Sequence, residues 1–340
     1  MTKTSKIYIS GHTGTAGSAI LKKLISLGYT NIIYKSHSEL DLMDCKRVDD
    51  FFSCERPEYV FCTAAKMIPI GQNNKADILY ENTLIQNNII HNSYKYKVKK
   101  MISLGSSWMY PESSVNPIKE KELFNSYFNK HAEPYALAKA HCAKMIEYYN
   151  RDYGTQFIFT PLTNLYGPCK ELDLDKSRVF IAMMRKIHLA KLYFEDNFDG
   201  LKKDTGLYKI DEIISFLNIN GIFKDRLELW GTGNTRREFL FSEDLADACI
   251  FLMNTNIDFQ KNCLINIGTG VDITIKELSE MMSMAIKYKG RIIFDASKPD
   301  SNMNRLLDIS NINKLGWKCK TDLDTGIQFM YNWYIDRNGI

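Results

Sequence analysis

Features that mark secreted, metal-binding or membrane-spanning proteins are scarce in this sequence. Its eight cysteines lack the paired short spacings of a zinc site, and 340 residues are far more than a disulfide-stapled secreted domain contains. No apolar run approaches the roughly 18 residues of a membrane span, and no charged-then-apolar leader precedes the first apolar run. We therefore expect free thiols, no bound metal and a soluble, cytoplasmic protein.

An excess of one charge is also missing. The 44 Lys and Arg residues stand against 40 Asp and Glu residues, which gives a formal net charge of +4. Because the two signs are interspersed, no basic footprint for nucleic acid is expected, and no membrane partner is expected either. The small positive excess suits an anionic small-molecule substrate.

What the sequence does contain is a regular alternation of short apolar runs and helical patterns. The expected strands are 6–10, 31–34, 59–62, 101–104 and 157–160, and the expected helices are 18–27, 48–52, 78–94 and 135–153. Strands that alternate with helices in this way form a parallel sheet covered on both faces. The predicted fold class is α/β, with a doubly wound parallel-sheet Rossmann domain and a smaller C-terminal substrate lobe.

The length of the chain suits one Rossmann domain and one smaller lobe. We place the cofactor-binding domain at 1–170, with its sheet completed by 225–270, and the smaller lobe at 171–340. An insertion is expected at about 194–225, where Asn and Gly residues are frequent. A lid over the substrate and a plain surface excursion both remain open for this insertion.

A glycine turn follows the first expected strand. Glycines allow a tight turn and a close approach of the backbone to a pyrophosphate, which binds the free N–H groups of the helix that follows. The turn therefore predicts a bound dinucleotide, although a structural turn alone would explain two of the glycines. Its G-x-x-G-x-x-G pattern contains Gly11, Thr13, Gly14, Thr15, Ala16 and Gly17.

The end of the second expected strand bears on the choice between NAD and NADP. An NAD enzyme usually places an acid there, and that carboxylate repels a 2′-phosphate. Here Lys35, Ser36 and His37 follow the strand, with no acid until Glu39. A lysine point charge helped by Ser36 and His37 could hold the phosphate, whereas Lys35 could also be merely a solvated lysine. The pattern favours NADP.

Ser106, Tyr135 and Lys139 form a candidate hydride-transfer set. Tyr-x-x-x-Lys puts both side chains on one face of a helix, where an ammonium beside a phenol makes the phenol a better proton donor. Ser106 follows an expected strand and could polarise a ketone, and Lys139 could also bind the nicotinamide ribose. Each residue alone could be structural, but their order and spacing after a glycine turn indicate a ketone reductase.

The segments around this set resemble GDP-L-fucose synthases, which are extended short-chain dehydrogenases/reductases that act on a nucleotide-linked 4-keto sugar. The resemblance implies NADPH as cofactor, a GDP-linked 4-keto-6-deoxy sugar (hexose or heptose) as substrate, and a homodimer formed through helices 78–94 and 135–153. Such an enzyme would serve deoxysugar biosynthesis for a capsule or another surface polysaccharide. The matching segments are 105–111, 133–139, 149–154, 161–168, 229–233, 237–240, 266–270 and 294–300.

By position, the resemblance assigns further residues to the two ligands. Arg237 and Lys298 would neutralise the diphosphate, and Trp230 would pack against the nucleotide. Trp230 could instead be a core aromatic residue, and Asn164 a capping amide. The cofactor contacts would include Asp41 and Leu42 near the adenine, and Ala64, Ala65 and Lys66 near the ribose. The substrate contacts would be Ser107, Trp108, Asn164, Arg178, Val179, Lys186, Trp230, Arg237 and Lys298.

Two residues that the epimerase step of GDP-L-fucose synthases needs are absent. The family uses a Cys and a His as acid/base pair, and the matching positions hold Trp108 and Arg178. An indole N–H is barely acidic and a guanidinium stays protonated, so neither can exchange a proton near neutral pH. The leading hypothesis is therefore an NADPH-dependent C4-keto reductase without C3/C5 epimerase activity.

Three alternatives remain open. A bifunctional GDP-L-fucose synthase could draw its acid/base pair from other residues, such as Cys169 or His188. A binding protein could keep the fold without chemistry, although the complete Ser/Tyr/Lys set speaks against it. An NAD-retaining epimerase or dehydratase is disfavoured, because no acid ends the second strand. The identity of the sugar and the configuration of the product at C4 do not follow from the sequence.

Overall fold

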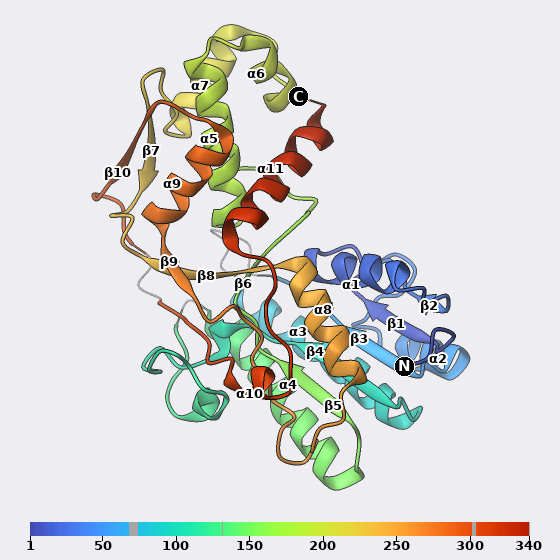
Figure 1. The fold of residues 1–340 in the computed structure, drawn as a ribbon. Helices are drawn as coiled ribbons and strands as arrows, with labels where there is room; N and C mark the ends of the chain where they lie inside the picture. Colours follow the sequence, from blue (N-terminus) through green and yellow to red (C-terminus); the bar gives the residue numbers. More distant parts are fainter. Residues whose placement is uncertain (68–73, 131, 301–303, 340) are drawn as a thin grey trace. The chain divides into compact units, whose positions relative to one another are not determined.

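The computed structural model describes residues 1–67, 74–130, 132–300 and 304–339 (Figure 1). The chain forms two compact units, and it passes between them several times. Unit 1 contains Met1–Leu165, Glu238–Gly270 and Arg305–Lys320, and unit 2 contains Tyr166–Arg237, Val271–Asn304 and Thr321–Ile340.

Unit 1 is built on a five-stranded parallel sheet. Neighbouring strands pair in parallel throughout, and the strand order changes direction between β1 and β3. Ligands of such sheets bind at the carboxyl ends of the strands, beside this switch point. The predicted α/β fold with a parallel sheet is confirmed. The strands are β1 (Ile7–Ser10), β2 (Ile32–Ile33), β3 (Tyr59–Cys62), β4 (Lys100–Leu104) and β5 (Phe157–Thr160), in the order β2-β1-β3-β4-β5.

Helices cover both faces of this sheet. Successive strand residues point to opposite faces, so Ile7 and Ile9 join the core formed with α1 and α8, whereas Tyr8 joins the core formed with α2, α3 and α4. Both sets are buried, which agrees with the continuous apolar run from Ile7 to Ile9. The helices of unit 1 are α1 (Thr15–Ser26), α2 (Cys45–Glu55), α3 (Lys75–Lys95), α4 (Glu133–Tyr153), α8 (Ser242–Asn254) and α10 (Ser310–Lys314), with the 3-10 turns η1 (Ser107–Met109) and η2 (Glu120–Phe124).

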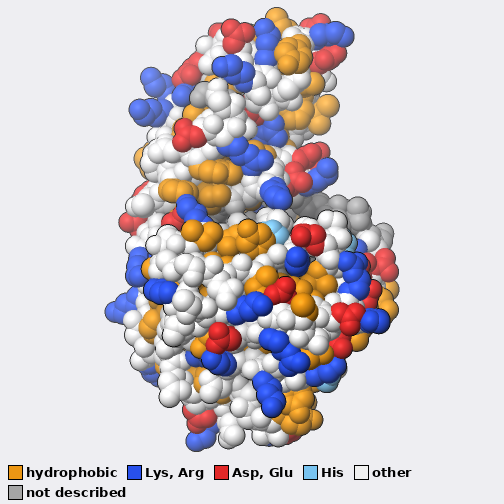
Figure 2. Space-filling model, turned by 90° about the vertical axis from the view of Figure 1, so that its right-hand side faces the viewer, with side chains coloured by type: hydrophobic (Ala, Val, Ile, Leu, Met, Phe, Trp, Pro, Cys, Tyr) orange, Lys and Arg blue, Asp and Glu red, His pale blue; other side chains and the backbone are white. Residues whose placement is uncertain are grey.

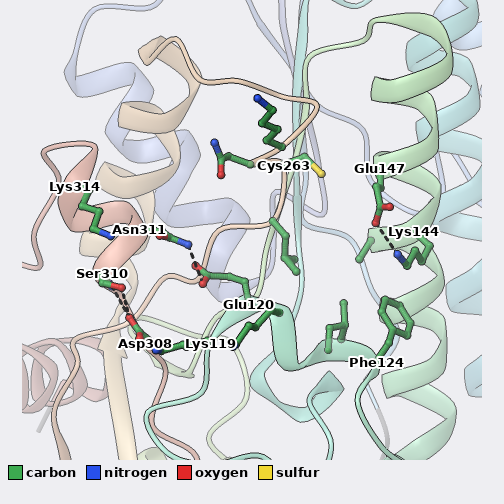
Figure 3. A pocket seen from close by; sticks show the side chains of 16 residues that line it. Lys119, Glu120, Phe124, Lys144, Glu147, Cys263, Asp308, Ser310, Asn311 and Lys314 are labelled. Carbon is green, nitrogen blue, oxygen red and sulfur yellow. Dashed lines mark hydrogen bonds and ion pairs between the residues drawn. The ribbon is translucent and has the colours of Figure 1, made fainter.

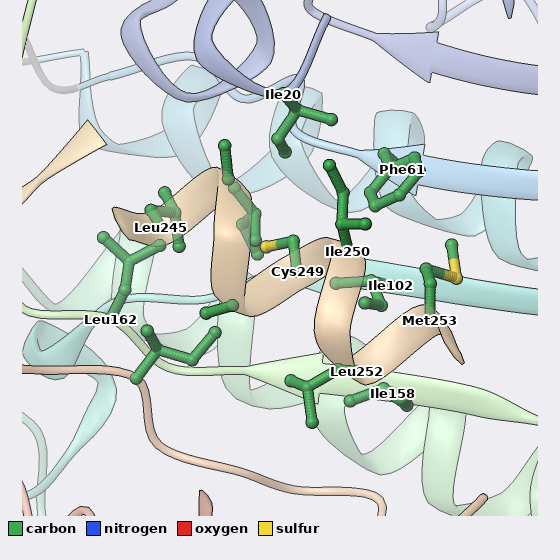
Figure 4. Packing of buried hydrophobic residues seen from close by; sticks show 14 of the residues in the cluster. Ile20, Phe61, Ile102, Ile158, Leu162, Leu245, Cys249, Ile250, Leu252 and Met253 are labelled. Carbon is green, nitrogen blue, oxygen red and sulfur yellow. The ribbon is translucent and has the colours of Figure 1, made fainter. Parts of the chain in front are cut away.

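Helix α8 comes from late in the chain and completes the first of these cores. Figure 4 shows its Cys249 and Leu252 in the same cluster as Ile20 of α1 and Ile102 of β4. Beyond β5, isolated parallel bridges join Phe159 to Leu264 and Leu162 to Ile267. Unit 1 therefore needs residues from well beyond position 238 to bury both faces of its sheet.

Unit 2 combines short strands with helices. Strands β7 and β10 form a parallel pair. A further small sheet has the order β6-β8-β9, and residues 164–165 of β6 and 238–241 of β8 are counted in unit 1. The strands are β6 (Asn164–Tyr166), β7 (Arg226–Trp230), β8 (Arg236–Phe241), β9 (Asp272–Thr274) and β10 (Arg291–Asp295). The helices are α5 (Val179–Phe194), α6 (Phe198–Thr205), α7 (Ile210–Ile219), α9 (Ile275–Ile286) and α11 (Leu323–Asn338).

The segment 194–225, for which the sequence left a lid and a surface excursion open, contains helices α6 and α7. Near the end of α6, the buried carboxylate of Asp204 accepts a hydrogen bond from Arg185 Nε of α5 at 2.9 Å. It also accepts one from the hydroxyl of Tyr334 on α11. Asp204 therefore anchors this segment in the packed interior of unit 2.

The surface and the side-chain inventory carry few special features. On the face shown in Figure 2, Lys and Arg side chains are interspersed with Asp and Glu. All eight cysteines are free thiols. Within the described ranges, no helix is long and apolar enough to cross a membrane, and His, Cys, Asp and Glu form no group of three that could hold a metal.

Candidate active site

The glycine turn joins β1 to α1, and packing explains two of its glycines. Gly11 has a φ of +72°, and a Cβ there would lie 2.8 Å from the Ala64 nitrogen. A Cβ on Gly17 would lie 2.3 Å from the Gly11 carbonyl oxygen. Gly14 is the N-cap of α1 and offers no side-chain cap, so the first N–H groups of α1 stay open. This cradle fits the pyrophosphate of a dinucleotide.

A carboxylate lies among the residues that were predicted to bind a 2′-phosphate. Glu39 Oε2 accepts hydrogen bonds from Ser36 N at 2.8 Å and from Ser36 Oγ at 2.6 Å, and Glu39 Oε1 lies 3.7 Å from Lys35 Nζ. The Ser36 hydrogen bonds lower the pKa of the Glu39 carboxyl. The Nδ1 atom of His37 lies 3.9 Å from Asp41 Oδ1. Glu39 would have to turn away before a phosphate could bind Lys35 and Ser36.

Two buried asparagines of α3, which the sequence did not single out, hold the segments expected near the adenine and the ribose. Asn82 accepts from Lys66 N and donates to Lys66 O, both at 2.9 Å, and so fixes the chain just after Ala64 and Ala65. Asn88 donates to the carbonyl of Leu42 at 2.8 Å. The available signal was the presence of amide side chains on the apolar face of a long helix.

The structure gathers the Tyr/Lys pair at the end of β4. Tyr135 and Lys139 are both buried in α4, and Lys139 Nζ lies 5.8 Å from the Tyr135 ring centroid. Lys139 Nζ donates to the carbonyl of Leu104, the last residue of β4, at 2.8 Å. Ser106 follows two residues later as the N-cap of η1. The three predicted catalytic residues therefore all belong to unit 1. Tyr135 and Lys139 lie on α4, which contacts the end of β4, and Ser106 follows that strand end.

Ser106 Oγ accepts a hydrogen bond from the backbone N–H of Trp108 at 3.3 Å. Because the oxygen acts as an acceptor there, the hydroxyl hydrogen is left for another partner. Ser107, by contrast, is buried. Of the two adjacent serines, Ser106 is the one that the structure leaves partly exposed.

Several predicted substrate residues lie in unit 2. Trp230 ends β7 with 72% of its surface exposed, and Lys298 Nζ lies 5.6 Å from its ring. The reading of Trp230 as a core aromatic residue is therefore wrong. Burial lowers the pKa of Lys186 and of Arg237, and Arg237 Nη1 donates to the carbonyl of Arg236 at 2.8 Å.

The remaining predicted substrate residues occupy helix and strand ends. Arg178 is the N-cap residue of α5, and Val179 is its first residue; both are exposed. Asn164 belongs to unit 1, where its amide donates to the carbonyl of Glu238 at 2.9 Å. This contact joins β6 to β8, so it is a structural contact other than the capping role that the sequence had left open for Asn164.

The two residues considered as a substitute acid/base pair are engaged elsewhere. His188 is 2% exposed, its Nδ1 lies 3.0 Å from the Tyr331 hydroxyl, and burial lowers its pKa to about 4. Cys169 donates to the carbonyl of Glu171 at 3.3 Å, and burial raises the pKa of its thiol. Neither side chain has the exposure and the pKa that proton exchange with a sugar near neutral pH requires.

A pocket of about 530 Å3 in unit 1 is lined by other residues (Figure 3). Glu120 of η2, Lys144 of α4 and Asn311 of α10 contribute to its lining, and Glu120 accepts a hydrogen bond from Asn311 at 3.0 Å. It contains none of the predicted catalytic or ligand-binding residues. The pocket is therefore not the candidate active site.

Comparison with known proteins identifies the family. A family model described as the NAD dependent epimerase/dehydratase family matches residues 7–268, which is more than half of the chain. The chain belongs to this family. Membership in the NAD dependent epimerase/dehydratase family confirms the prediction of an enzyme that uses a nicotinamide dinucleotide.

Individual members of this family are similar over nearly the whole chain. GDP-L-fucose synthase of Escherichia coli is 35% identical and covers 97% of both chains. A GDP-D-glycero-L-gluco-heptose synthase of Campylobacter jejuni, solved with NADPH, is 44% identical with a TM-score of 0.92, over 98% of this chain and 99% of that one. A GDP-mannoheptose C4 reductase of the same organism, solved with NADP bound, is 45% identical with a TM-score of 0.91 and the same coverage. These relatives confirm the resemblance to GDP-L-fucose synthases.

Proposed function

We propose that this chain is an NADPH-dependent C4-keto reductase that acts on a GDP-linked 4-keto-6-deoxy sugar, hexose or heptose, without C3/C5 epimerase activity. The observation that carries the proposal is the contact of Lys139 with the Leu104 carbonyl, which holds Tyr135 and Lys139 beside the end of β4, where Ser106 follows. The Campylobacter jejuni relatives, whose names specify a GDP-heptose synthase and a C4 reductase, support the substrate class and the reaction.

The cofactor is NADPH, as in the related solved structures. The turn from Gly11 to Gly17 would hold its pyrophosphate, and Lys35 with Ser36 would hold the 2′-phosphate once Glu39 has turned aside. The segments that Asn82 and Asn88 fix would lie along the ribose and the adenine. In this arrangement the glycine turn would supply N–H donors to the pyrophosphate, and Lys35 would supply a positive charge to the 2′-phosphate.

When bound, NADPH supplies the hydride for C4. Tyr135 donates its phenolic proton to the oxygen that becomes negative as the C4 ketone is reduced, and Ser106 donates a hydrogen bond to the same oxygen. Lys139 donates one N–H to the Leu104 carbonyl, which leaves its other N–H groups for Tyr135 and the nicotinamide ribose. Its positive charge favours the deprotonated tyrosine that remains after proton donation. Solvent then returns a proton to Tyr135.

The side chains at the expected positions support the proposal that the enzyme has no epimerase step. Trp108 and Arg178 cannot exchange an α-proton near neutral pH, and His188 and Cys169 are engaged elsewhere. The overall similarity to GDP-L-fucose synthase of Escherichia coli favours the bifunctional enzyme as the second candidate. A non-catalytic binding protein is disfavoured by the complete set of Ser106, Tyr135 and Lys139.

The guanosine diphosphate would be bound mainly by side chains of unit 2. Trp230 is an exposed aromatic surface for a purine, and Lys298, close to its ring, together with Arg237 would neutralise phosphate charge. A cytoplasmic homodimer that serves surface-polysaccharide biosynthesis is the setting we propose for this enzyme.

The decisive experiment is reduction of a panel of GDP-4-keto-6-deoxy sugars with NADPH in D2O, followed by NMR of the product. We expect NADPH oxidation, a new C4 alcohol, and no enzyme-dependent deuterium at C3 or C5. Deuterium at either carbon would show that an acid/base pair exists and would move the bifunctional synthase to first place. Failure to oxidise NADPH with every sugar would refute the reductase.

A further inference from the structure

The turn that carries Ser106 is held by a residue to which the proposed mechanism gives no role. Arg305 is 6% exposed. Its Nη1 donates to the carbonyl of Ser107 at 2.9 Å and to the carbonyl of Tyr110 at 2.8 Å. One guanidinium nitrogen thus binds carbonyl groups at both ends of η1, almost two hundred residues away along the chain.

One of these carbonyls belongs to the peptide group that contacts the Ser106 hydroxyl. The Ser107 carbonyl and the Trp108 N–H form a single planar peptide, so fixing the oxygen also fixes the direction of the N–H. That N–H donates to Ser106 Oγ at 3.3 Å. A charged donor on the carbonyl also polarises the peptide and strengthens the hydrogen bond that its N–H donates.

We propose that Arg305 is a positioning residue for Ser106, acting through the Ser107–Trp108 peptide. The guanidinium holds the carbonyl, and the N–H holds the Ser106 oxygen as an acceptor. The Ser106 hydroxyl hydrogen then donates to the substrate ketone. This inference rests on the proposed reduction, in which Ser106 stabilises the oxygen at C4.

Other contacts keep the turn folded without Arg305, so its role can be separated from folding. Ser107 N donates to the Leu162 carbonyl at 2.8 Å, and the Tyr110 hydroxyl donates to Asn266 Oδ1 at 2.6 Å. The Ser107 carbonyl also accepts a hydrogen bond from Tyr110 N, at the longer distance of 3.2 Å. Loss of the Arg305 side chain should therefore leave unit 1 folded but make the orientation of the Ser107–Trp108 peptide less fixed.

The main chain beside Arg305 is also anchored independently of its side chain. Leu306 N donates to Asn116 Oδ1 at 2.8 Å, and Ile118 N donates to the Leu306 carbonyl at 2.7 Å. A side-chain substitution at 305 therefore leaves the segment in place. Arg305→Met keeps an unbranched apolar stem without donors, and Arg305→Lys keeps a charge and donors on a shorter stem.

The test compares these two variants with the wild type by hydrogen–deuterium exchange of the peptide that covers 105–111 and by steady-state kinetics. In Arg305→Met we expect faster exchange in this peptide and a kcat lowered about 10- to 100-fold, because small misplacements of catalytic groups cost factors of this size. The KM for NADPH should change by less than about twofold, since the glycine turn is untouched. Arg305→Lys should lie between Arg305→Met and the wild type.

The matched control is Arg185→Met, which removes another largely buried arginine that donates to a carbonyl, that of Leu172 at 2.8 Å, far from η1 in sequence and in unit 2. At a temperature where both proteins are folded, this control should lose thermal stability but keep its kcat. A kcat of Arg305→Met that falls no further than that of the control, or unchanged exchange over 105–111, would overturn the proposal.

Failure of the proposed function would look different. The exchange measurement needs no substrate, so it decides whether Arg305 holds the turn even if the wild type reduces no GDP-linked ketone. A wild type that is inactive on every such sugar refutes the reduction. Faster exchange in Arg305→Met with a fully active enzyme refutes the positioning role alone.

Discussion

Tyr135 is the residue on which the proposed reduction depends most directly. Tyr135→Phe removes the proton donor but keeps the buried ring beside Lys139. We expect reduction to fall by about 10²- to 10⁴-fold, which is the usual contribution of a positioned acid or base, while NADPH binds nearly as before. Stopped-flow kinetics and fluorescence titration measure the two effects. A loss of less than about tenfold would contradict the role of Tyr135 as proton donor.

Glu39 and Lys35 should set the preference between NADPH and NADH. Glu39→Gln removes a negative charge beside Lys35 and Ser36, so NADPH should bind more tightly. Lys35→Glu should reduce or reverse the preference, because a second carboxylate repels the 2′-phosphate. Titration of each variant with both cofactors checks this, with Glu212→Gln, an exposed lysine-paired glutamate of unit 2, as control. Equal affinity of the wild type for both cofactors contradicts the prediction.

At the scale of elements, the packing of α5, α6 and α11 contains a histidine that should make unit 2 sensitive to acid. Burial lowers the pKa of His188 from its ordinary 6.5 to about 4, while Asp204 raises it and Lys191 and Arg185 lower it. At a pH between these two pKa values, His188 is protonated in the unfolded chain and neutral in the folded chain. Stability should therefore fall as the pH drops from about 6.5 to about 4, by on the order of 1–3 kcal/mol.

Urea unfolding at pH 7 and at pH 4.5 measures this loss. The free energy of unfolding of His188→Gln should differ less between the two pH values than that of the wild type, because the group that takes up the proton on unfolding is gone. His37→Gln, which changes a histidine with 79% side-chain exposure, should keep the wild-type difference. Identical pH dependence in His188→Gln and the wild type would show that His188 does not cause the loss.

Helix α6 shows why the sequence did not reveal the elements of 194–225. The frequent Asn and Gly residues of this segment predict an insertion, but two of them, Asn197 and Gly206, cap α6. The Asn197 side chain accepts a hydrogen bond from Gly200 N at 2.9 Å, and Gly206 ends the helix with a φ of +70°. Capping residues and loop residues are the same types. With only eight residues, α6 has too few turns for apolar periodicity to decide between them.

At the scale of the whole molecule, we predict a homodimer formed through α3 and α4. On these helices Tyr94 and Tyr153 stack at 4.4 Å, and Tyr153 remains 57% exposed. Light scattering at micromolar protein should give twice the chain mass, and Tyr153→Lys should weaken the dimer by adding a charge to an apolar interface. Tyr208→Lys, at an 80% exposed position of unit 2, should not. A monomeric wild type would contradict the prediction.

The sequence by itself determined the features that depend on neighbours in the chain. The apolar run 6–10 predicted a strand, and β1 covers Ile7–Ser10. The glycine spacing from Gly11 to Gly17 predicted a turn that leads into a helix, and that turn leads into α1. The spacing of Tyr135 and Lys139 placed them on one helix face, as observed. Apolar periodicity and motif spacing are local properties, so they can be read before the chain is folded.

Only the tertiary structure decided contacts between distant residues. Glu39 turns back on Ser36, His188 is enclosed by unit 2, and Arg305 reaches the carbonyl of Ser107. In each case the role depends on burial and on a hydrogen-bond partner supplied by folding. Arg305 shows this most clearly, because a lone arginine late in the chain has no periodicity or motif, and its function follows only from the two carbonyls it meets.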